Sequence, residues 1–118
     1  MDERPILHIV SRSVWIAAEQ RGLPYKGETF ETEGFIHCST PEQVIEVANY
    51  LYHGINGLIL LKIDPSKVTS PTRYEDAGNG KLYPHIYGPL NLEAVVGTID
   101  FTPQADGTFA ALNLTMSK

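Results

Sequence analysis

Residues 34–54, GFIHCSTPEQVIEVANYLYHG, predict a short strand that runs directly into an amphipathic helix. Thr40 and Gln43 have the spacing of a capping box, in which each side chain pairs with a backbone N–H of the first turn. Pro41 occupies the first helical position, where a backbone N–H is not needed. One apolar face at i, i+3, i+4 and i+7 is made by Val44, Val47, Ala48 and Leu51. We therefore expect a helix that begins at Thr40 and stops at Gly54.

Strands and a second helix are expected around this stretch. Residues 35–38 read as the short strand, and residues 6–10, ILHIV, as an apolar strand that only a histidine interrupts. The helix-like VWIAAEQRG at 14–22 can end at Gly22 in the left-handed conformation. Residues 57–64, GLILLKID, are typical of a buried strand.

The carboxyl-terminal half reads as antiparallel sheet. Residues 81–88, KLYPHIYG, form an extended pattern, and Pro84 cannot donate a ladder hydrogen bond, so this strand is expected at a sheet edge or at a bulge. Asp106 and Gly107 separate the strand-like runs AVVGTIDFT and GTFAALNL and are a strong hairpin signal. The expected fold class is α+β: one domain over residues 1–118, with two helices packed on a twisted, partly split, mainly antiparallel sheet.

Two segments show little periodicity. Residues 22–34 are expected to be a surface connection with at most a short strand near 28–30. Residues 65–80 contain two prolines, two glycines and the acidic pair Glu75 and Asp76, and they read as a long loop. Loops of this length in compact domains are often functional lids or mobile segments.

Composition excludes several classes of function. The 118 residues, 42% of them hydrophobic, suit one globular domain. A formal net charge of -5, from 9 basic and 14 acidic residues, disfavours nucleic acid as a partner. The single cysteine, Cys38, excludes an internal disulfide and suits a cytoplasmic location. The apolar runs are shorter than a signal-peptide core or the ~20 residues of a membrane span, so we expect neither export nor a membrane partner.

Three of the four histidines interrupt strands and are the main functional signal. His8, His37 and His85 each stand among apolar residues, and Tyr83 and Tyr87 share a face with His85 because side chains alternate along a strand. Any one of these histidines could be a buried ring bonded to a backbone carbonyl. Together they predict one concave site lined by three imidazoles and two tyrosines.

Metal binding and covalent catalysis are the alternatives at these positions. Histidines and Cys38 are acceptable zinc ligands, but His37 and Cys38 point to opposite faces of one strand, and no usual ligand spacing occurs. Cys38 could also be a nucleophile paired with a histidine, but it can equally be a small buried hydrophobic residue. Ser39 and Thr40 lie at the start of the helix, where N–H groups and the helix dipole favour a phosphate or carboxylate, although Thr40 also serves as a cap.

The motifs GFIHCST followed by Q, then YE, then YPHIYGPLN followed by AV, resemble domain of unknown function 952, a small bacterial family. That family is similar in outline to the ADP-ribosyltransferase fold. The larger group holds nicotinamide adenine dinucleotide (NAD) in the cleft of a split sheet and uses three strand-borne positions. The resemblance therefore implies NAD as a cofactor or substrate.

The resemblance also implies roles for individual residues. His8 matches a first-strand histidine that contacts the NAD ribose. The second motif lies at a strand-to-helix junction, near the nicotinamide, and here it offers His37, Ser39 and Thr40. Either Tyr87 or Tyr83 is expected to stack on the nicotinamide ring.

The third motif departs from the usual pattern. That position is normally a glutamate that stabilises an oxocarbenium-like transition state, whereas this chain has His85 and Tyr87. Glu75 can supply the carboxylate if the long loop closes over the cleft. We therefore expect a nucleotide-binding protein, with His85, Tyr87 and Glu75 as catalytic residues of a weak or specialised NAD-dependent transferase or glycohydrolase. The alternatives are a non-catalytic small-ligand sensor or interaction module and a histidine-based metal site.

Overall fold

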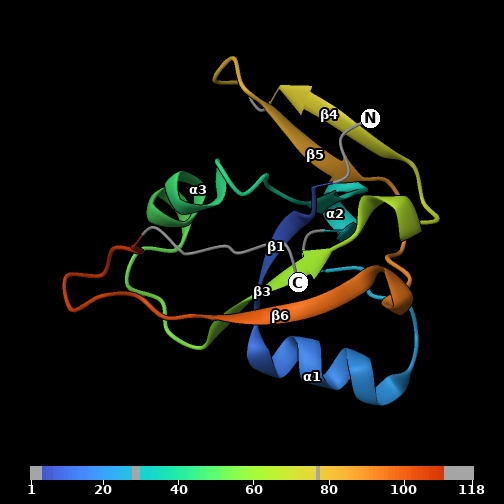
Figure 1. Cartoon of the computed structure of the whole chain (residues 1–118), viewed down its shortest axis with the longest axis horizontal. Coiled ribbons are helices and arrows are strands. Elements are labelled where there is room, and N and C mark those ends of the chain that lie inside the picture. Colours follow the sequence, from blue (N-terminus) through green and yellow to red (C-terminus); the bar gives the residue numbers. More distant parts are fainter. Residues whose placement is uncertain (1–3, 28–29, 77, 111–118) are drawn as a thin grey trace.

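The computed structural model describes residues 4–27, 30–76 and 78–110, which form an α+β fold with two small antiparallel sheets. The first sheet has the order β1-β3-β6, formed by Ile6–Ser11, Leu58–Ile63 and Val95–Phe101. The second has the order β2-β5-β4, formed by Ile36–His37, Leu82–Ile86 and Thr72–Asp76. In Figure 1, β4 and β5 lie side by side at the top of the view, above the first sheet.

Three α-helical segments accompany the sheets: α1 (Arg12–Arg21), the single turn α2 (Phe30–Glu33) and α3 (Val44–Leu51). Two short 3-10 turns, η1 (Pro65–Lys67) and η2 (Leu92–Ala94), complete the described elements. Figure 1 shows α1 below the first sheet and α3 above α1, beside the upper end of β1. None of the helices in the described part of the chain has the length and apolar character needed to cross a membrane.

The strands β1 and β3 of the first sheet are buried on both faces, because one face packs against α1 and the second sheet and the other against α3. Alternate residues of β1 and β3 pack toward α1 and the second sheet. The cluster on this face includes Ile6, Val10, Trp15, Ile59, Leu61 and Ile86. The intervening residues pack toward α3, in a second cluster of Leu7, Ile9, Val44, Ala48, Leu60 and Phe101. A strand buried on both faces carries a nearly continuous apolar run, which explains the sequences ILHIV and LILLKI.

The carboxyl-terminal end of α1 matches the sequence prediction, but this helix begins two residues before the predicted stretch. The helix α3 begins later than expected and ends three residues before Gly54. Ser11 Oγ accepts a hydrogen bond from the N–H of Val14, and Gly22 ends α1 at φ 68° with its N–H 3.1 Å from the Ala18 carbonyl oxygen. Before α3, the Thr40 N–H donates to Gln43 Oε1 at 3.0 Å, as in a capping box. Residues 41–43 form a turn, so the α-helix itself starts four residues after Thr40.

Opposite Pro84, the segment that follows β2 leaves the second sheet and joins the first sheet. The N–H of Cys38 donates to the Pro84 carbonyl at 3.0 Å, but proline has no N–H to return the bond, so the β2–β5 ladder ends there. The next residue, Ser39, pairs instead with Leu7 of β1 through two backbone hydrogen bonds of 2.8 Å. The prediction of an edge strand or a bulge for KLYPHIYG is wrong, because β5 lies between β2 and β4 and pairs with both in continuous register.

The predicted long loop over residues 65–80 is also wrong. It contains η1 and the strand β4, which pairs with β5 from Thr72 opposite Ile86 to Asp76 opposite Leu82. Because β4 is an edge strand with a largely exposed, polar sequence, it lacks the apolar pattern by which a strand is recognised.

Two smaller expectations also need correction. Of the short strand near 28–30, residues 28 and 29 lie outside the described chain, and Phe30 begins the helical turn α2. Gly107 does form the expected turn, and its N–H donates to the Gln104 carbonyl at 2.8 Å. Residues 108–110 do not continue as a strand, and residues 111–114 of the predicted strand lie outside the described part.

Candidate functional site

A pocket of about 1030 Å³ lies where β1, β2 and β5 meet α3. Ligand pockets usually measure about 300–1,000 Å³, so this one has room for a ligand the size of a nucleotide. The predicted site residues that line it are His8, His37, Ser39, Tyr83 and His85. The other three predicted residues, Thr40, Glu75 and Tyr87, are not among the described residues of its wall.

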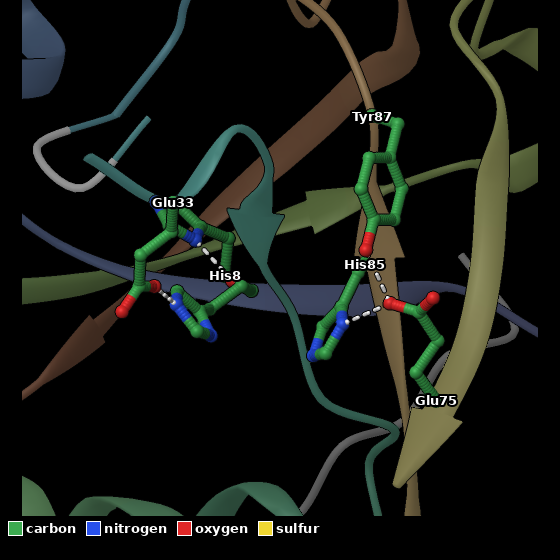
Figure 2. A network of polar contacts seen from close by, with 6 residues as sticks. His8, Glu33, Glu75, His85 and Tyr87 are labelled. Carbon is green, nitrogen blue, oxygen red and sulfur yellow. Dashed lines mark hydrogen bonds and ion pairs between the residues drawn. The ribbon is translucent and has the colours of Figure 1, made fainter. Parts of the chain in front are cut away.

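His85 belongs to a hydrogen-bonded network on the second sheet that centres on Glu75. Its Nδ1 lies 2.9 Å from Oε1 of Glu75, and the Tyr87 hydroxyl donates to the same oxygen at 2.5 Å. Figure 2 shows Glu75 bridging these two side chains, while the other nitrogen of the His85 ring points away from Glu75. A carboxylate beside Nδ1 holds the proton there, so Nε2 is the nitrogen that can accept or deliver a proton in the pocket.

The network keeps Glu75 ionised. The hydrogen bonds from Tyr87 and then His85 hold the pKa of the Glu75 carboxyl below its ordinary value. The hydrogen bond to Glu75 raises the pKa of the Tyr87 phenol, which therefore stays protonated as a donor. The predicted closing loop is not needed, because the pairing of β4 with β5 brings Glu75 to His85.

His37 stands opposite His85 in the β2–β5 ladder and forms a second pair with a carboxylate. The two imidazole rings lie 5.4 Å apart between centroids. Nε2 of His37 contacts Oε1 of Glu33, four residues earlier in the chain. Both of these side chains are about half exposed, whereas the His85 side chain is 7% exposed.

Phe35 holds the two rings together from one side. Its ring stacks on His85 with centroids 4.2 Å apart and planes inclined by 19°, and it meets the edge of His37 at 4.7 Å. It also lies 5.1 Å from the Tyr87 ring. These aromatic contacts restrict rotation of His85 and give its hydrogen bond to Glu75 a fixed direction.

His8 is bound on both of its ring nitrogens. Nδ1 lies 2.6 Å from the His37 carbonyl oxygen, which can only accept, so Nδ1 carries the proton and donates. The hydroxyl of Tyr25 then donates to Nε2 at 2.8 Å. Burial lowers the pKa of His8 to about 4, so the ring is neutral near pH 7. A ribose contact by His8 would have to replace one of these bonds.

At the strand-to-helix junction, the backbone groups of Ser39 and the N–H of Thr40 form hydrogen bonds within the protein. Both backbone groups of Ser39 pair with Leu7, and its buried side chain lines the pocket. The Thr40 N–H is bonded to Gln43, which agrees with the capping role. Burial raises the pKa of the Cys38 thiol, so a thiolate nucleophile is disfavoured.

The described residues do not assemble a metal centre. Within residues 4–27, 30–76 and 78–110, no group of three or more His, Cys, Asp or Glu side chains is placed to hold a metal ion. His8 is also a poor ligand, since neither of its nitrogens is available without breaking a hydrogen bond.

The pocket has a polar end and an apolar end. The histidines, Ser39, Tyr25 and Tyr83 form the polar end. The apolar end consists of Val47 and Leu51 of α3, Ile55 after it and Leu58 of β3, and α3 also contributes Glu46 to the wall. Tyr50 on α3 also lines it and is 85% exposed. Of the described lining residues, none is lysine or arginine, and two are glutamates. The ligand that fits best has hydrogen-bonding groups at one end and a flat or apolar group at the other.

Sequence reasoning missed three residues of the site. Glu33 precedes His37 by four residues, and Phe35 precedes it by two, so their spacing contained a usable signal. For Tyr25 the sequence contained no such signal, because its contact with His8 depends on an isolated bridge to Leu90, which is distant in the sequence.

Comparison with known proteins gives a family and a conserved architecture without an activity. Residues 9–98 match the family described as protein of unknown function (DUF952). The crystal structure of protein CC0527 from Caulobacter crescentus is 31% identical, with a TM-score of 0.81 over 90% of this chain and 93% of that one. Its solution NMR structure is 32% identical, with a TM-score of 0.77 over 88% and 90%. No curated protein matches the chain.

Proposed function

We propose that this chain, which belongs to the DUF952 family, binds an ADP-ribose-containing nucleotide such as NAD and uses His85 for proton transfer at the ribose. The observation that carries the proposal is the placement of His85: Nδ1 is held by Glu75 while the ring lines the pocket. A histidine oriented by a carboxylate is a common general acid or base.

The donors and acceptors of the pocket suit such a ligand. Ribose hydroxyls require hydrogen-bonding side chains, which the polar end supplies through Ser39, Tyr83 and the imidazoles. The apolar wall of α3 suits a flat base, and Tyr83 stands at the pocket with its hydroxyl held by the Asn79 amide at 3.0 Å. Because the described lining residues include no lysine or arginine, the phosphates are expected to lie toward solvent.

The residues have distinct roles in the proposed reaction. NAD, when bound, supplies a ribose whose nicotinamide leaves as a neutral ring. His85 accepts the proton of the attacking water or hydroxyl group on Nε2. Glu75 acts through His85 by fixing its orientation, and Tyr87 fixes Glu75 in turn. Glu75 therefore does not itself place a negative charge at the ribose, and turnover of NAD is expected to be slow.

His8 is assigned a supporting role in this proposal. Its two hydrogen bonds connect β1 to the backbone of His37 and to Tyr25, which keeps the floor of the pocket in place. The ADP-ribosyltransferase-like reading of the fold belongs to the same proposal and rests on the sequence motifs. The motifs at β1, at the β2–α3 junction and at β5 meet at one pocket, which is what that reading requires.

Calorimetry and thermal unfolding with NAD and ADP-ribose test the proposal on metal-free protein. A ligand that binds the native state raises the melting temperature, so both compounds should do so. The variant His85→Gln should bind but release nicotinamide at least about 10²-fold more slowly. His53→Gln is the matched control, because His53 is exposed and lies outside the pocket.

The outcomes separate the alternatives. No shift and no heat at millimolar concentration of either compound would remove the nucleotide proposal. Binding without any nicotinamide release by the wild type would leave the non-catalytic sensor or interaction module as the function.

A further inference from the structure

We infer that His37 and Glu33 form a second proton-transfer pair facing His85, and that the site hydrolyses ADP-ribosyl groups joined through oxygen. The inference rests on the proposed function and specifies its substrate class. The observation behind it is that the β2–β5 ladder sets two histidines, each with its own carboxylate, against one pocket.

The ladder brings the two imidazoles close. Cys38 and Pro84 form the neighbouring hydrogen-bonded pair, so His37 and His85 occupy a non-hydrogen-bonded pair, where facing side chains are nearest. Their centroids are 5.4 Å apart with the planes at 74°, and Phe35 contacts both rings. This separation lets the two rings approach the same small group of a ligand.

Each imidazole has one nitrogen at a carboxylate. In His85 this is Nδ1, beside Glu75, and in His37 it is Nε2, beside Glu33. The opposite nitrogen of each ring is then the one that can exchange a proton with a ligand. In the proposed step, His85 enters with Nε2 unprotonated as the base, and His37 enters as the imidazolium, with protons on both nitrogens, as the acid. The two pairs differ in exposure, since His37 and Glu33 are half exposed and His85 is nearly enclosed.

The charged and titratable groups around the pair come from four elements. His37 faces Glu33 of α2 and His8 of β1, and His8 is neutral. His85 faces Glu75, and Arg73 of β4 stands opposite it in the ladder with its guanidinium 5.5 Å from the Tyr87 ring. The remaining groups are the phenols of Tyr83 and Tyr87 on and after β5.

These positions support a hydrolysis in which protons balance. His85 takes a proton from water on Nε2, and the water oxygen forms a bond to the ribose carbon. The bond from that carbon to the leaving oxygen breaks, and its electron pair stays on the leaving oxygen, which takes a proton from Nδ1 of His37. The half-exposed His37 then regains a proton from solvent, and His85 returns one to solvent.

Whether the second pair is needed depends on the leaving group of the substrate. Nicotinamide departs neutral and needs no proton, so cleavage of NAD would use His85 alone. An alcohol or hydroxyl side chain departs as an alkoxide unless an acid protonates it, and this is the work that His37 can do. Two pairs therefore suit removal of an oxygen-linked ADP-ribosyl group better than its attachment from NAD.

Two synthetic probes with different leaving groups test this assignment. Phenyl and p-nitrophenyl O-glycosides of ADP-ribose present the same sugar, but p-nitrophenoxide leaves without protonation and phenoxide leaves poorly. His37→Gln should lower kcat for the phenyl compound by about 10²-fold or more and affect the p-nitrophenyl compound much less. His85→Gln should slow both, because both need an activated water.

Glu33→Gln tests the positioning carboxylate. It should show the same leaving-group difference as His37→Gln with a smaller loss, since the imidazole is still present. Glu31→Gln on the same helical turn is the matched control, because Glu31 is exposed and not part of the pocket wall, and it should match the wild type.

The results distinguish this inference from the proposed function. If ADP-ribose binds but neither glycoside is cleaved, or if His37→Gln slows both glycosides equally, the second pair is not a proton donor while the nucleotide site stands. If ADP-ribose does not bind at all, both proposals fall.

Discussion

Each of the two sheets contains a buried histidine, and the two imidazole rings differ in their hydrogen bonds. His8 on the first sheet and His85 on the second are 9% and 6% exposed, so burial does not distinguish them. His8 has both nitrogens in hydrogen bonds to the protein, whereas His85 gives one nitrogen to Glu75 and lines the pocket. The partners of a buried imidazole, and not its depth, therefore decide whether it is structural or available for chemistry.

The substitution His8→Ala should give the largest effect on folding. It removes a buried ring and leaves the Tyr25 hydroxyl and the His37 carbonyl without their partner, which costs about 3–5 kcal/mol of unfolding free energy. Urea unfolding measures this loss. If His85→Ala proved as destabilising as His8→Ala, the proposed difference between the two histidines would be wrong.

The pH dependence of stability sharpens the same comparison. The pKa of His8 is lower in the folded protein, about 4 against 6.5, so between these values the unfolded chain binds more protons. Stability is fully present above pH 6.5 and falls as the pH drops toward 4, by about 3 kcal/mol in total from this residue.

Urea unfolding at pH 7 and pH 4.5 checks this expectation. His8→Asn has no group that titrates in this window at position 8, so it should lose clearly less stability between the two pH values than the wild type. Equal losses in the two proteins would show that His8 is not the responsible group.

Tyr25→Phe separates the two hydrogen bonds of His8. It removes the donor to Nε2 and keeps the ring packing against Trp15, so the expected cost is about 1–3 kcal/mol, which is smaller than for His8→Ala. The measurement is again the urea midpoint. A cost as large as that of His8→Ala would assign the stability to Tyr25 itself.

Glu75→Gln should have the smallest effect on folding and a visible one on the site. The carboxylate is partly exposed at an edge strand, so the urea midpoint should hardly move. The ring proton and carbon NMR signals of His85 should change, because Nδ1 loses its charged partner. Unchanged His85 signals would contradict the orienting role of Glu75.

Local sequence patterns were sufficient for the elements whose signal lies within the segment. The Thr40–Gln43 spacing and the apolar face after it predicted a helix close to its observed place, and Gly22 correctly predicted the end of α1. The apolar runs of β1 and β3 were equally clear, because both faces of these strands are buried.

Patterns failed where a strand or a contact depends on a distant segment. The sequence predicts a loop in place of β4 because this strand has few buried apolar residues and is stabilised mainly by its pairing with β5. Glu75 is therefore brought to His85 by the pairing of β4 with β5, and not by the loop closure that the sequence predicts.

The sequence by itself determined α1, α3, β1 and β3 and the residue types of the site, because periodicity, caps and strand-borne histidines are properties of neighbouring residues. Only the tertiary structure decided which nitrogen of each histidine is engaged, since hydrogen bonds to Tyr25, Glu75 and the His37 carbonyl join residues 10 to 29 positions apart. Such partners follow from the register of paired strands and from the turn at Pro84, which no local pattern specifies.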